Sequence, residues 1–310
     1  MPIKTNSFFI SCFFDNFLKK SVEMKYQTEI EVAITSALET GEILKRYFKN
    51  RDKLQTQYKS KSGRGSPVTN ADFESNEILK SKITSAFPDD GWLSEETIDD
   101  EARLNKQRVW IVDPLDGTND FLSGVPEFSV SIALVEDKIP MLGVVYNPVS
   151  GELYFGVKGE GSFLLKVKDE EDGNISFFEL FNSSRVQKLK VGDGGKIPAE
   201  ASVIVSRKEL KRVDKIKFLV SKFGQVKFRE SIAYKIVSVA SGWADAVVSI
   251  FDKSEWDLAG AHIIAEEAGF KVTDSRGEKI FYNEKNVRKP GVIVATDSLH
   301  EDILKILNSE

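Results

Sequence analysis

The chain centres on one stretch, Val109-Trp110-Ile111-Val112-Asp113-Pro114-Leu115-Asp116-Gly117-Thr118-Asn119-Asp120-Phe121. Its first half is apolar and β-branched, which predicts a buried strand. We expect the strand to end at Asp113, because Pro114 cannot continue the hydrogen-bonded ladder and Asp116-Gly117 is a turn signal. Thr118 is expected to cap a short helix that follows.

This turn offers ligands for a cation and for an anion. Asp113 and Asp116 leave a fixed support three residues apart, and paired carboxylates of this kind hold a hard cation such as Mg²⁺. Free N–H groups at a helix start hold a phosphate. Asp-Pro and Asp-Gly pairs are also common in ordinary turns, so the stretch alone leaves a purely structural role open.

The composition narrows the chemistry. A chain of 310 residues that is 41% hydrophobic and 29% charged is typical of a globular protein with one large or two moderate domains. A net charge of −5 argues against a nucleic acid polymer as partner. Cys12 stands alone, which excludes a cysteine zinc site, and His262 and His300 are far apart. Acidic residues must therefore carry any metal chemistry.

The start of the chain differs from the rest. The apolar run at 8–14 is broken by Asp15 and is too short to span a bilayer. A weak secretory signal and an appended start are the alternatives, since a clean helical pattern begins after Met24. We interpret residues 1–23 as an extension outside the core and predict a cytoplasmic protein that does not enter a membrane.

The pattern of periodicities predicts a mixed α/β protein with two subdomains. A polar, Gly-rich region around 182–201 places the boundary, giving an α+β subdomain at 24–185 and an α/β subdomain at 186–310. The expected helices are 30–48, 71–87, 209–223, 231–241, 256–268 and 299–307. The expected strands are 92–96, 109–113, 128–135, 142–146, 153–155, 202–205, 226–228, 244–250, 270–273 and 291–296, those at 128–155 forming an antiparallel meander.

A polar loop at 59–70 carries three cations, Lys59, Lys61 and Arg64. It is either a solvated loop or a flexible cationic lid over an anionic site.

Several acids end a predicted strand or begin a predicted helix: Asp72, Glu95, Asp113, Asp116 and Asp257. Two or three Mg²⁺ ions bridged by such carboxylates would form a clamp for phosphoryl transfer to water. The simpler alternative for the last of them is an N-cap.

Four motifs give the chain a resemblance to a known family. They are Val68-Thr69-Asn70-Ala71-Asp72, Ser94-Glu95-Glu96, Trp110-Ile111-Val112-Asp113-Pro114-Leu115-Asp116-Gly117-Thr118 and Trp256-Asp257-Leu258-Ala259-Gly260-Ala261. In this order they resemble the inositol monophosphatase superfamily, the Mg²⁺-dependent, lithium-sensitive phosphatases, over about residues 26–307. The resemblance implies a layered αβαβα sandwich that acts on a small phosphorylated substrate.

The resemblance also implies the metal ligands. One Mg²⁺ would bind Glu95, Asp113 and the backbone carbonyl of Leu115. A second would bind Asp113, Asp116 and Asp257, and Glu95 would help to hold a weaker third ion through water.

The remaining roles come from the same resemblance. Asp72 and Thr118 would orient and deprotonate the attacking water, and Gly117 and Thr118 would offer backbone N–H groups to the phosphate. Lys61 sits at the position of the family's loop lysine. A homodimer is left open.

The substrate is predicted from three positions. Inositol phosphatases place a glutamate seven residues before the second-motif aspartate, where this chain has Ile250. Lys235 falls where adenosine bisphosphate phosphatases carry a lysine, although an ordinary exposed helix lysine is the alternative. Glu230 replaces a glycine common to both branches. We favour a 3′(2′),5′-bisphosphate nucleotidase, with an inositol-1-monophosphatase, a fructose-1,6-bisphosphatase and a non-catalytic metal-binding regulator as alternatives.

Overall fold

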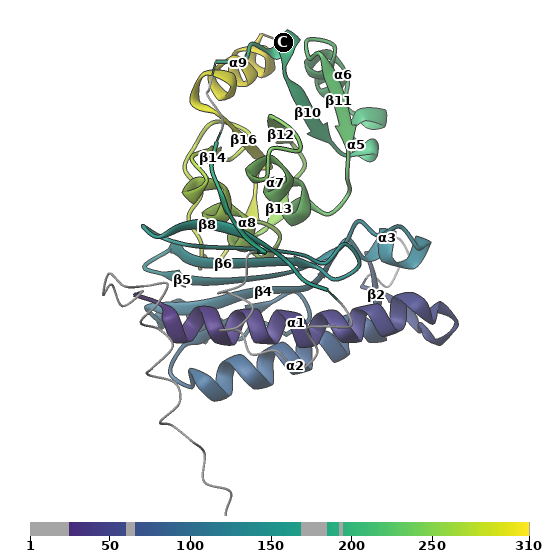
Figure 1. The fold of residues 1–310 in the computed structure, drawn as a ribbon, viewed down its shortest axis with the longest axis vertical. Helices are drawn as coiled ribbons and strands as arrows, with labels where there is room; N and C mark the ends of the chain where they lie inside the picture. Colours follow the sequence, from purple (N-terminus) through teal and green to yellow (C-terminus); the bar gives the residue numbers. More distant parts are fainter. Residues whose placement is uncertain (1–24, 60–65, 169–184, 192–194, 310) are drawn as a thin grey trace, which may run out of the picture.

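The structure, a computed structural model, describes residues 25–59, 66–168, 185–191 and 195–309. The extension predicted at 1–23 therefore lies outside the described residues. Helices and sheets alternate in five layers from α1 and α2 to α9 (Figure 1). This confirms the mixed α/β class and the expected αβαβα sandwich. No helix in the described ranges is long and apolar enough to cross a membrane.

The first sheet has seven strands in the order β3-β4-β5-β6-β7-β8-β9. Its strands are β3 (Gly91–Ser94), β4 (Arg108–Asp116), β5 (Ser129–Glu136), β6 (Ile139–Asn147), β7 (Glu152–Val157), β8 (Gly161–Lys166) and β9 (Val186–Leu189). β3 and β4 are parallel and the other pairs are antiparallel, so the predicted meander is confirmed. β8 and β9 were not predicted, and β9 follows directly after the proposed boundary. The division into two subdomains stays a prediction.

The strand that was expected to end at Asp113 continues to Asp116, so that prediction was wrong. Asp113 pairs with Ser131 and Asp116 pairs with Ser129, with a shift of register between them. Pro114 lies inside this bulge, where its missing N–H breaks no regular ladder bond. The bulge keeps both carboxylates on a strand that is rigid on either side.

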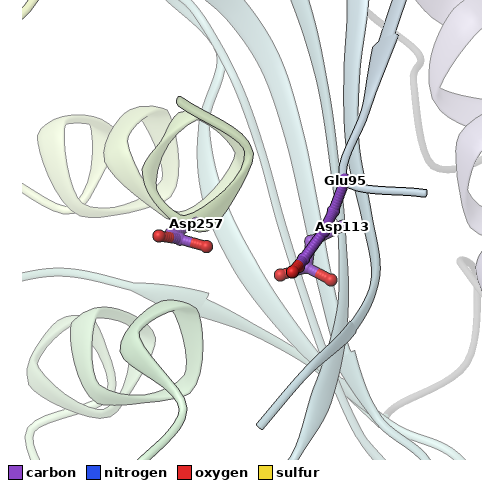
Figure 2. Close-up of side chains that lie close together, drawn as sticks. All are labelled: Glu95, Asp113 and Asp257. Carbon is purple, nitrogen blue, oxygen red and sulfur yellow. The ribbon is translucent and has the colours of Figure 1, made fainter. Parts of the chain in front are cut away.

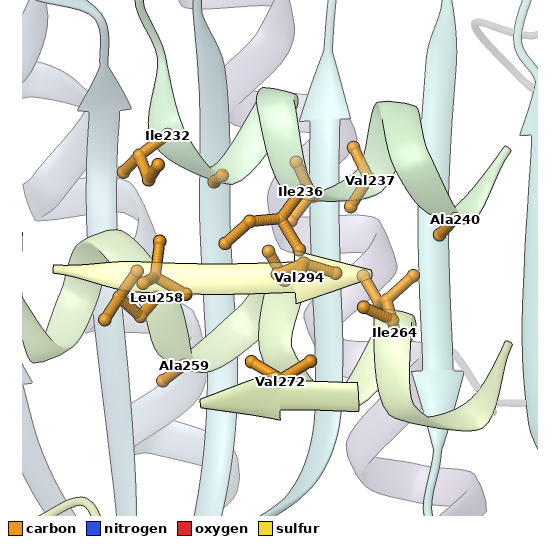
Figure 3. Close-up of a cluster of buried hydrophobic side chains, with 14 of the residues drawn as sticks. Ile232, Ile236, Val237, Ala240, Leu258, Ala259, Ile264, Val272 and Val294 are labelled. Carbon is orange, nitrogen blue, oxygen red and sulfur yellow. The ribbon is translucent and has the colours of Figure 1, made fainter. Parts of the chain in front are cut away.

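Helices cover both faces of the first sheet. α1 (Gln27–Lys49) and α2 (Asn70–Ala86) pack on one face, where Ile30 and Ile34 are fully buried. α7 (Ile232–Ala240) and α8 (Glu255–Glu267) lie between the first sheet and the second, in the apolar cluster of Figure 3. A Cβ on Gly143 of β6 would lie 2.0 Å from the Gly260 carbonyl oxygen. Glycine at this position therefore lets the α8 backbone lie directly on the sheet.

The second sheet has the order β11-β10-β12-β16-β14 and is mixed. Its strands are β10 (Ser202–Val205), β11 (Gln225–Phe228), β12 (Ala246–Ser249), β14 (Lys271–Thr273) and β16 (Val292–Ala295). α6 (Asp214–Val220) and α9 (Asp297–Asn308) cover its outer face. The single helix predicted at 209–223 is instead α5 (Arg207–Arg212) followed by α6, because Val213 between them is extended. Two short ladders were also not predicted: β1 (Thr56–Tyr58) with β2 (Pro67–Thr69), and β13 (Lys253–Ser254) with β15 (Arg288–Lys289).

Candidate active site

Three of the predicted carboxylates converge on one point. Glu95 follows β3, Asp113 lies in β4, and Asp257 belongs to the first turn of α8. One oxygen from each lies within 4.8 Å of the other two. Figure 2 shows Glu95 and Asp113 side by side on the sheet, with Asp257 facing them from the helix end. Glu95 and Asp257 are 162 positions apart in the sequence, yet they belong to one cluster.

Local hydrogen bonds orient two of these side chains. Asp113 Oδ1 accepts a 2.9 Å bond from the Leu115 N–H, and Asp257 Oδ2 accepts a 2.7 Å bond from the Ser254 N–H. Ser254 is the N-cap of α8 and Asp257 is its partner in a capping box, so the alternative of an N-cap at 257 was wrong. Each carboxylate uses one oxygen to hold its position and keeps the other for a ligand.

Asp116 lines the same cavity but is not one of the three converging residues. Its Oδ2 accepts bonds from Ser231 Oγ (2.6 Å) and from the Ala233 N–H (2.8 Å). A carboxylate of the first sheet is therefore held by the start of α7. The Leu115 carbonyl oxygen, also predicted as a ligand, lies 3.2 Å from Thr118 Oγ1.

The hydroxyl of Thr118 points to Asp72. Thr118 Oγ1 lies 3.2 Å from Asp72 Oδ1, while Asp72 Oδ2 accepts bonds from the N–H and the hydroxyl of Thr69. Thr118 does not cap α3 (Thr118–Ser123) as expected, because Gly117 occupies the N-cap position. Gly117 has φ 101°, and a Cβ there would lie 2.9 Å from the Glu127 carbonyl oxygen. The turn therefore requires glycine.

The negative charges of the site carboxylates are not balanced by enough positive charge around them. Burial raises the pKa of Asp72 to about 6, and burial together with the charges of Asp116 and Glu95 raises the pKa of Asp257 to about 7. Burial, followed by the charges of Glu95 and Asp116, raises the pKa of Asp113 well above its ordinary value. Oxygen ligands that repel one another at this spacing fit a hard divalent cation, which would relieve the repulsion.

Residues 25–310 match the Inositol monophosphatase family. The chain belongs to that family. It is 29% identical over 290 residues to Inositol monophosphatase 3 of Solanum lycopersicum, covering 90% of this chain and 96% of the relative. It is 30% identical to the Fructose-1,6-bisphosphatase/inositol-1-monophosphatase of Thermotoga maritima, covering 80% and 85%. The crystal structure of CysQ from Bacteroides thetaiotaomicron, a bacterial member of the same family, has a TM-score of 0.71 and 30% identity over 88% of this chain and 98% of that one. The chain is therefore a phosphatase of the inositol monophosphatase family.

In this phosphatase one cation already contacts the acidic cluster. Lys59 Nζ lies 2.6 Å from Glu95 Oε1 and 2.7 Å from Glu96 Oε1. Lys59 begins the segment at 59–70, for which a solvated loop and a cationic lid were both left open. Lys61, the predicted loop lysine, lies outside the described residues.

The cavity over the carboxylates has a volume of about 1160 Å³ and a basic wall. Lys235 of α7 lies in this wall and is only 2% exposed, so the alternative of an ordinary exposed lysine was wrong. Burial, and then the charge of Lys253, lowers the pKa of Lys235 to about 8. Within the described ranges, its ammonium group has no hydrogen-bond partner. A buried ammonium of this kind is available to an anionic ligand.

Sequence reasoning missed a buried acid in the same wall. Glu209 is 1% exposed, and its carboxylate accepts bonds from Ser249 Oγ, from Ser206 Oγ and from the N–H groups of Ile250 and Phe251. Although burial opposes it, the charge of Lys253 and the backbone N–H groups hold the pKa of Glu209 below its ordinary value. Glu209 stands among charged residues of an outwardly polar helix, which gave no sequence signal. Lys253 and Arg288, which also line the cavity, were missed because they lie in the two-residue strands β13 and β15, which were not predicted.

Proposed function

We propose that the chain is a Mg²⁺-dependent 3′(2′),5′-bisphosphate nucleotidase, which hydrolyses adenosine 3′,5′-bisphosphate to AMP and phosphate. The observation that carries this proposal is the buried ammonium of Lys235 in the wall of the carboxylate cavity. A substrate with a second phosphate supplies the anion that this group needs, and a substrate with hydroxyls alone does not.

Glu95, Asp113 and Asp257 would hold Mg²⁺, with Asp116 and the Leu115 carbonyl as the further predicted ligands. When bound, Mg²⁺ supplies positive charge that stabilises the phosphate and the leaving alkoxide. Two or three ions are expected from the family resemblance.

The water is activated by the chain's own residues. Asp72, with a pKa of about 6, can take a proton from the Thr118 hydroxyl, from which it lies 3.2 Å. Thr118 in turn can accept the proton of a water on its other side. The N–H groups of Gly117 and Thr118, which start α3, would orient the phosphate.

The position at 250 favours the nucleotidase over the inositol phosphatase. Ile250 lines the cavity, so no acid stands at the inositol-binding position. Glu209 does not replace it, because both of its oxygens already accept hydrogen bonds from the chain. Glu230 and Asp252 also line the cavity, so what is missing is the carboxylate at the position where inositol phosphatases carry their glutamate.

A phosphate-release panel tests the proposal. Adenosine 3′,5′-bisphosphate, inositol 1-phosphate and fructose 1,6-bisphosphate are compared with Mg²⁺ and with EDTA. We expect the highest kcat/KM for the first substrate and loss of all turnover in EDTA. The relative named fructose-1,6-bisphosphatase/inositol-1-monophosphatase supports the alternative outcome, a preference for one of the other two. If none of the three substrates is hydrolysed, the alternative of a non-catalytic metal-binding regulator is favoured. A cytoplasmic location and a homodimer stay predictions.

A further inference from the structure

Lys253 brings a second ammonium group to the cavity wall that holds Lys235. It lies in β13, where it pairs with Lys289 of β15. Arg288 of β15 fixes the same turn, because its guanidinium donates to Ser254 Oγ (2.8 Å) and to the Asp252 carbonyl oxygen (3.1 Å). The backbone that carries Lys253 is thus held on both sides, which limits where its side chain can reach.

The two ammonium groups are short of partners. Lys253 Nζ donates one bond, to the Phe251 carbonyl oxygen at 3.0 Å, and Lys235 Nζ donates none to any described residue. An ammonium carries three N–H donors, and buried donors cost free energy when they stay unpaired. The wall therefore presents several unused donors from two different elements, α7 and β13.

Glu209 does not satisfy these donors. Glu209 and Asp116 both act through their charges on the two lysines, but the oxygens of Glu209 accept hydrogen bonds from Ser206, Ser249 and two backbone N–H groups, and Asp116 Oδ2 accepts from Ser231 and Ala233. Lys235 and Lys253 line the same cavity, and their like charges repel each other. A group with two negative charges and several acceptor oxygens would relieve the repulsion and use the donors.

We propose that Lys253 acts with Lys235 to bind the second phosphate of the substrate, and that Lys253 makes the site selective for phosphomonoesters that carry such a group. This inference rests on the proposed function and adds a residue to it. The reacting phosphate lies over the carboxylates near Gly117 and Thr118, and the second phosphate lies between the lysines. A polyol monophosphate leaves both ammonium groups unpaired, so it is rejected.

Lys253→Met tests the inference by a ratio of substrates. The measured quantity is kcat/KM for adenosine 3′,5′-bisphosphate divided by that for adenosine 3′-monophosphate, which lacks the second phosphate. We expect the ratio to fall about tenfold in Lys253→Met, with most of the change in KM. Lys253→Arg should recover most of it. Fructose 1,6-bisphosphate, measured beside fructose 1-phosphate, shows whether a sugar bisphosphate uses the same lysines.

Lys211→Met is the matched control, since Lys211 is exposed on the cavity rim and the change removes the same charge. If Lys211→Met lowers the substrate ratio as much as Lys253→Met does, the effect comes from the overall positive charge of the wall. The inference is then overturned. Calorimetry of 5′-AMP and adenosine with the Mg²⁺-loaded protein gives a second readout. Lys253→Met should weaken 5′-AMP about tenfold and leave the folded protein at least as stable.

Two failures are distinguishable. If the wild-type protein has no preference for the bisphosphate over the monophosphate, the proposed function fails and this inference with it. If the wild-type preference is present and Lys253→Met retains it, only the role of Lys253 is overturned.

Discussion

Ser231 Oγ donates a 2.6 Å hydrogen bond to Asp116 Oδ2 and at the same time caps α7 by accepting a bond from the Tyr234 N–H. One hydroxyl therefore joins the start of a helix to a carboxylate of the first sheet. The carboxylate also accepts from the Ala233 N–H, so the helix start fixes one of its two oxygens completely. The other oxygen is left for the cavity.

We predict that Ser231→Ala weakens both stability and activity. Loss of an N-cap and of a bond to a buried charge should lower the free energy of unfolding by about 1–3 kcal/mol. Freer rotation of Asp116 should lower kcat/KM about tenfold. Thermal melting and phosphate release check these values. Ser241→Ala, at the other end of α7, is the control, and equal losses in both variants would argue against a special role for Ser231.

Asp113→Asn should abolish turnover and yet stabilise the metal-free protein. Asp113 is almost fully buried beside Glu95 and Asp257, and an amide removes one of the repelling charges. In EDTA at neutral pH, we expect the Tm to rise by about 3 °C or more, whereas the gain in Tm on adding Mg²⁺ should be largely lost. Asp89→Asn, in an exposed turn, should change neither. Full activity of Asp113→Asn at saturating Mg²⁺ would refute the metal site.

The metal-free protein should lose stability as the pH rises from about 4 to about 7. The pKa values of Asp72 and Asp257 are about 6 and about 7 in the folded protein, above the ordinary value of 3.8. The folded state thus binds more protons than the unfolded state in this range, so the free energy of unfolding falls as the pH rises through it. The gain in Tm on adding Mg²⁺ should accordingly be larger at about pH 7.5 than at about pH 5. An equal gain at both would contradict the assignment.

Lys59→Met should tighten the binding of Mg²⁺. Lys59 occupies Glu95 Oε1 at 2.6 Å, so this ion pair must loosen before Glu95 can turn fully to a metal. Calorimetric titration with Mg²⁺ should give a Kd lower by about threefold, the scale of a half-exposed ion pair. Lys82→Met removes an ion pair with Glu39, neither of which lines the cavity, and is the control. Weaker binding in Lys59→Met would show that Lys59 instead holds Glu95 in place.

The acidic cluster was largely foreseeable from the sequence. Asp113 follows a β-branched run and Asp257 precedes small apolar residues, so each carboxylate could be placed at the end of a rigid element. These signals are local, and with the alternation of strands and helices they indicated α/β layers; the αβαβα order was implied by the resemblance to the inositol monophosphatase superfamily. The close packing of α8 on β6, where Gly143 lies against the Gly260 carbonyl oxygen, was not predicted.

Contacts between distant turns were not foreseeable. Nothing near Ser231 in the sequence points to Asp116, and the burial of Lys235 depends on the two sheets that enclose α7. Glu209 lies in a highly charged helix, yet it is turned inward by four hydrogen-bond donors from β12 and its neighbours. The bulge at Pro114 lets β4 continue to Asp116, although the rule that proline ends a strand predicted its end at Asp113.

The choice of substrate should follow from Lys235 and Ile250. Lys235→Ala removes a buried ammonium from the cavity wall, so the KM for adenosine 3′,5′-bisphosphate should rise about tenfold or more, a loss of about 1.4 kcal/mol or greater. A small monoester without the second phosphate should be affected much less. Ile250→Glu adds a carboxylate to the same wall, which repels the second phosphate and can accept hydrogen bonds from hydroxyls. Its kcat/KM should therefore shift toward inositol 1-phosphate. If Lys235→Ala weakens both substrates equally, or if the wild-type protein already prefers inositol 1-phosphate, the site is that of an inositol phosphatase.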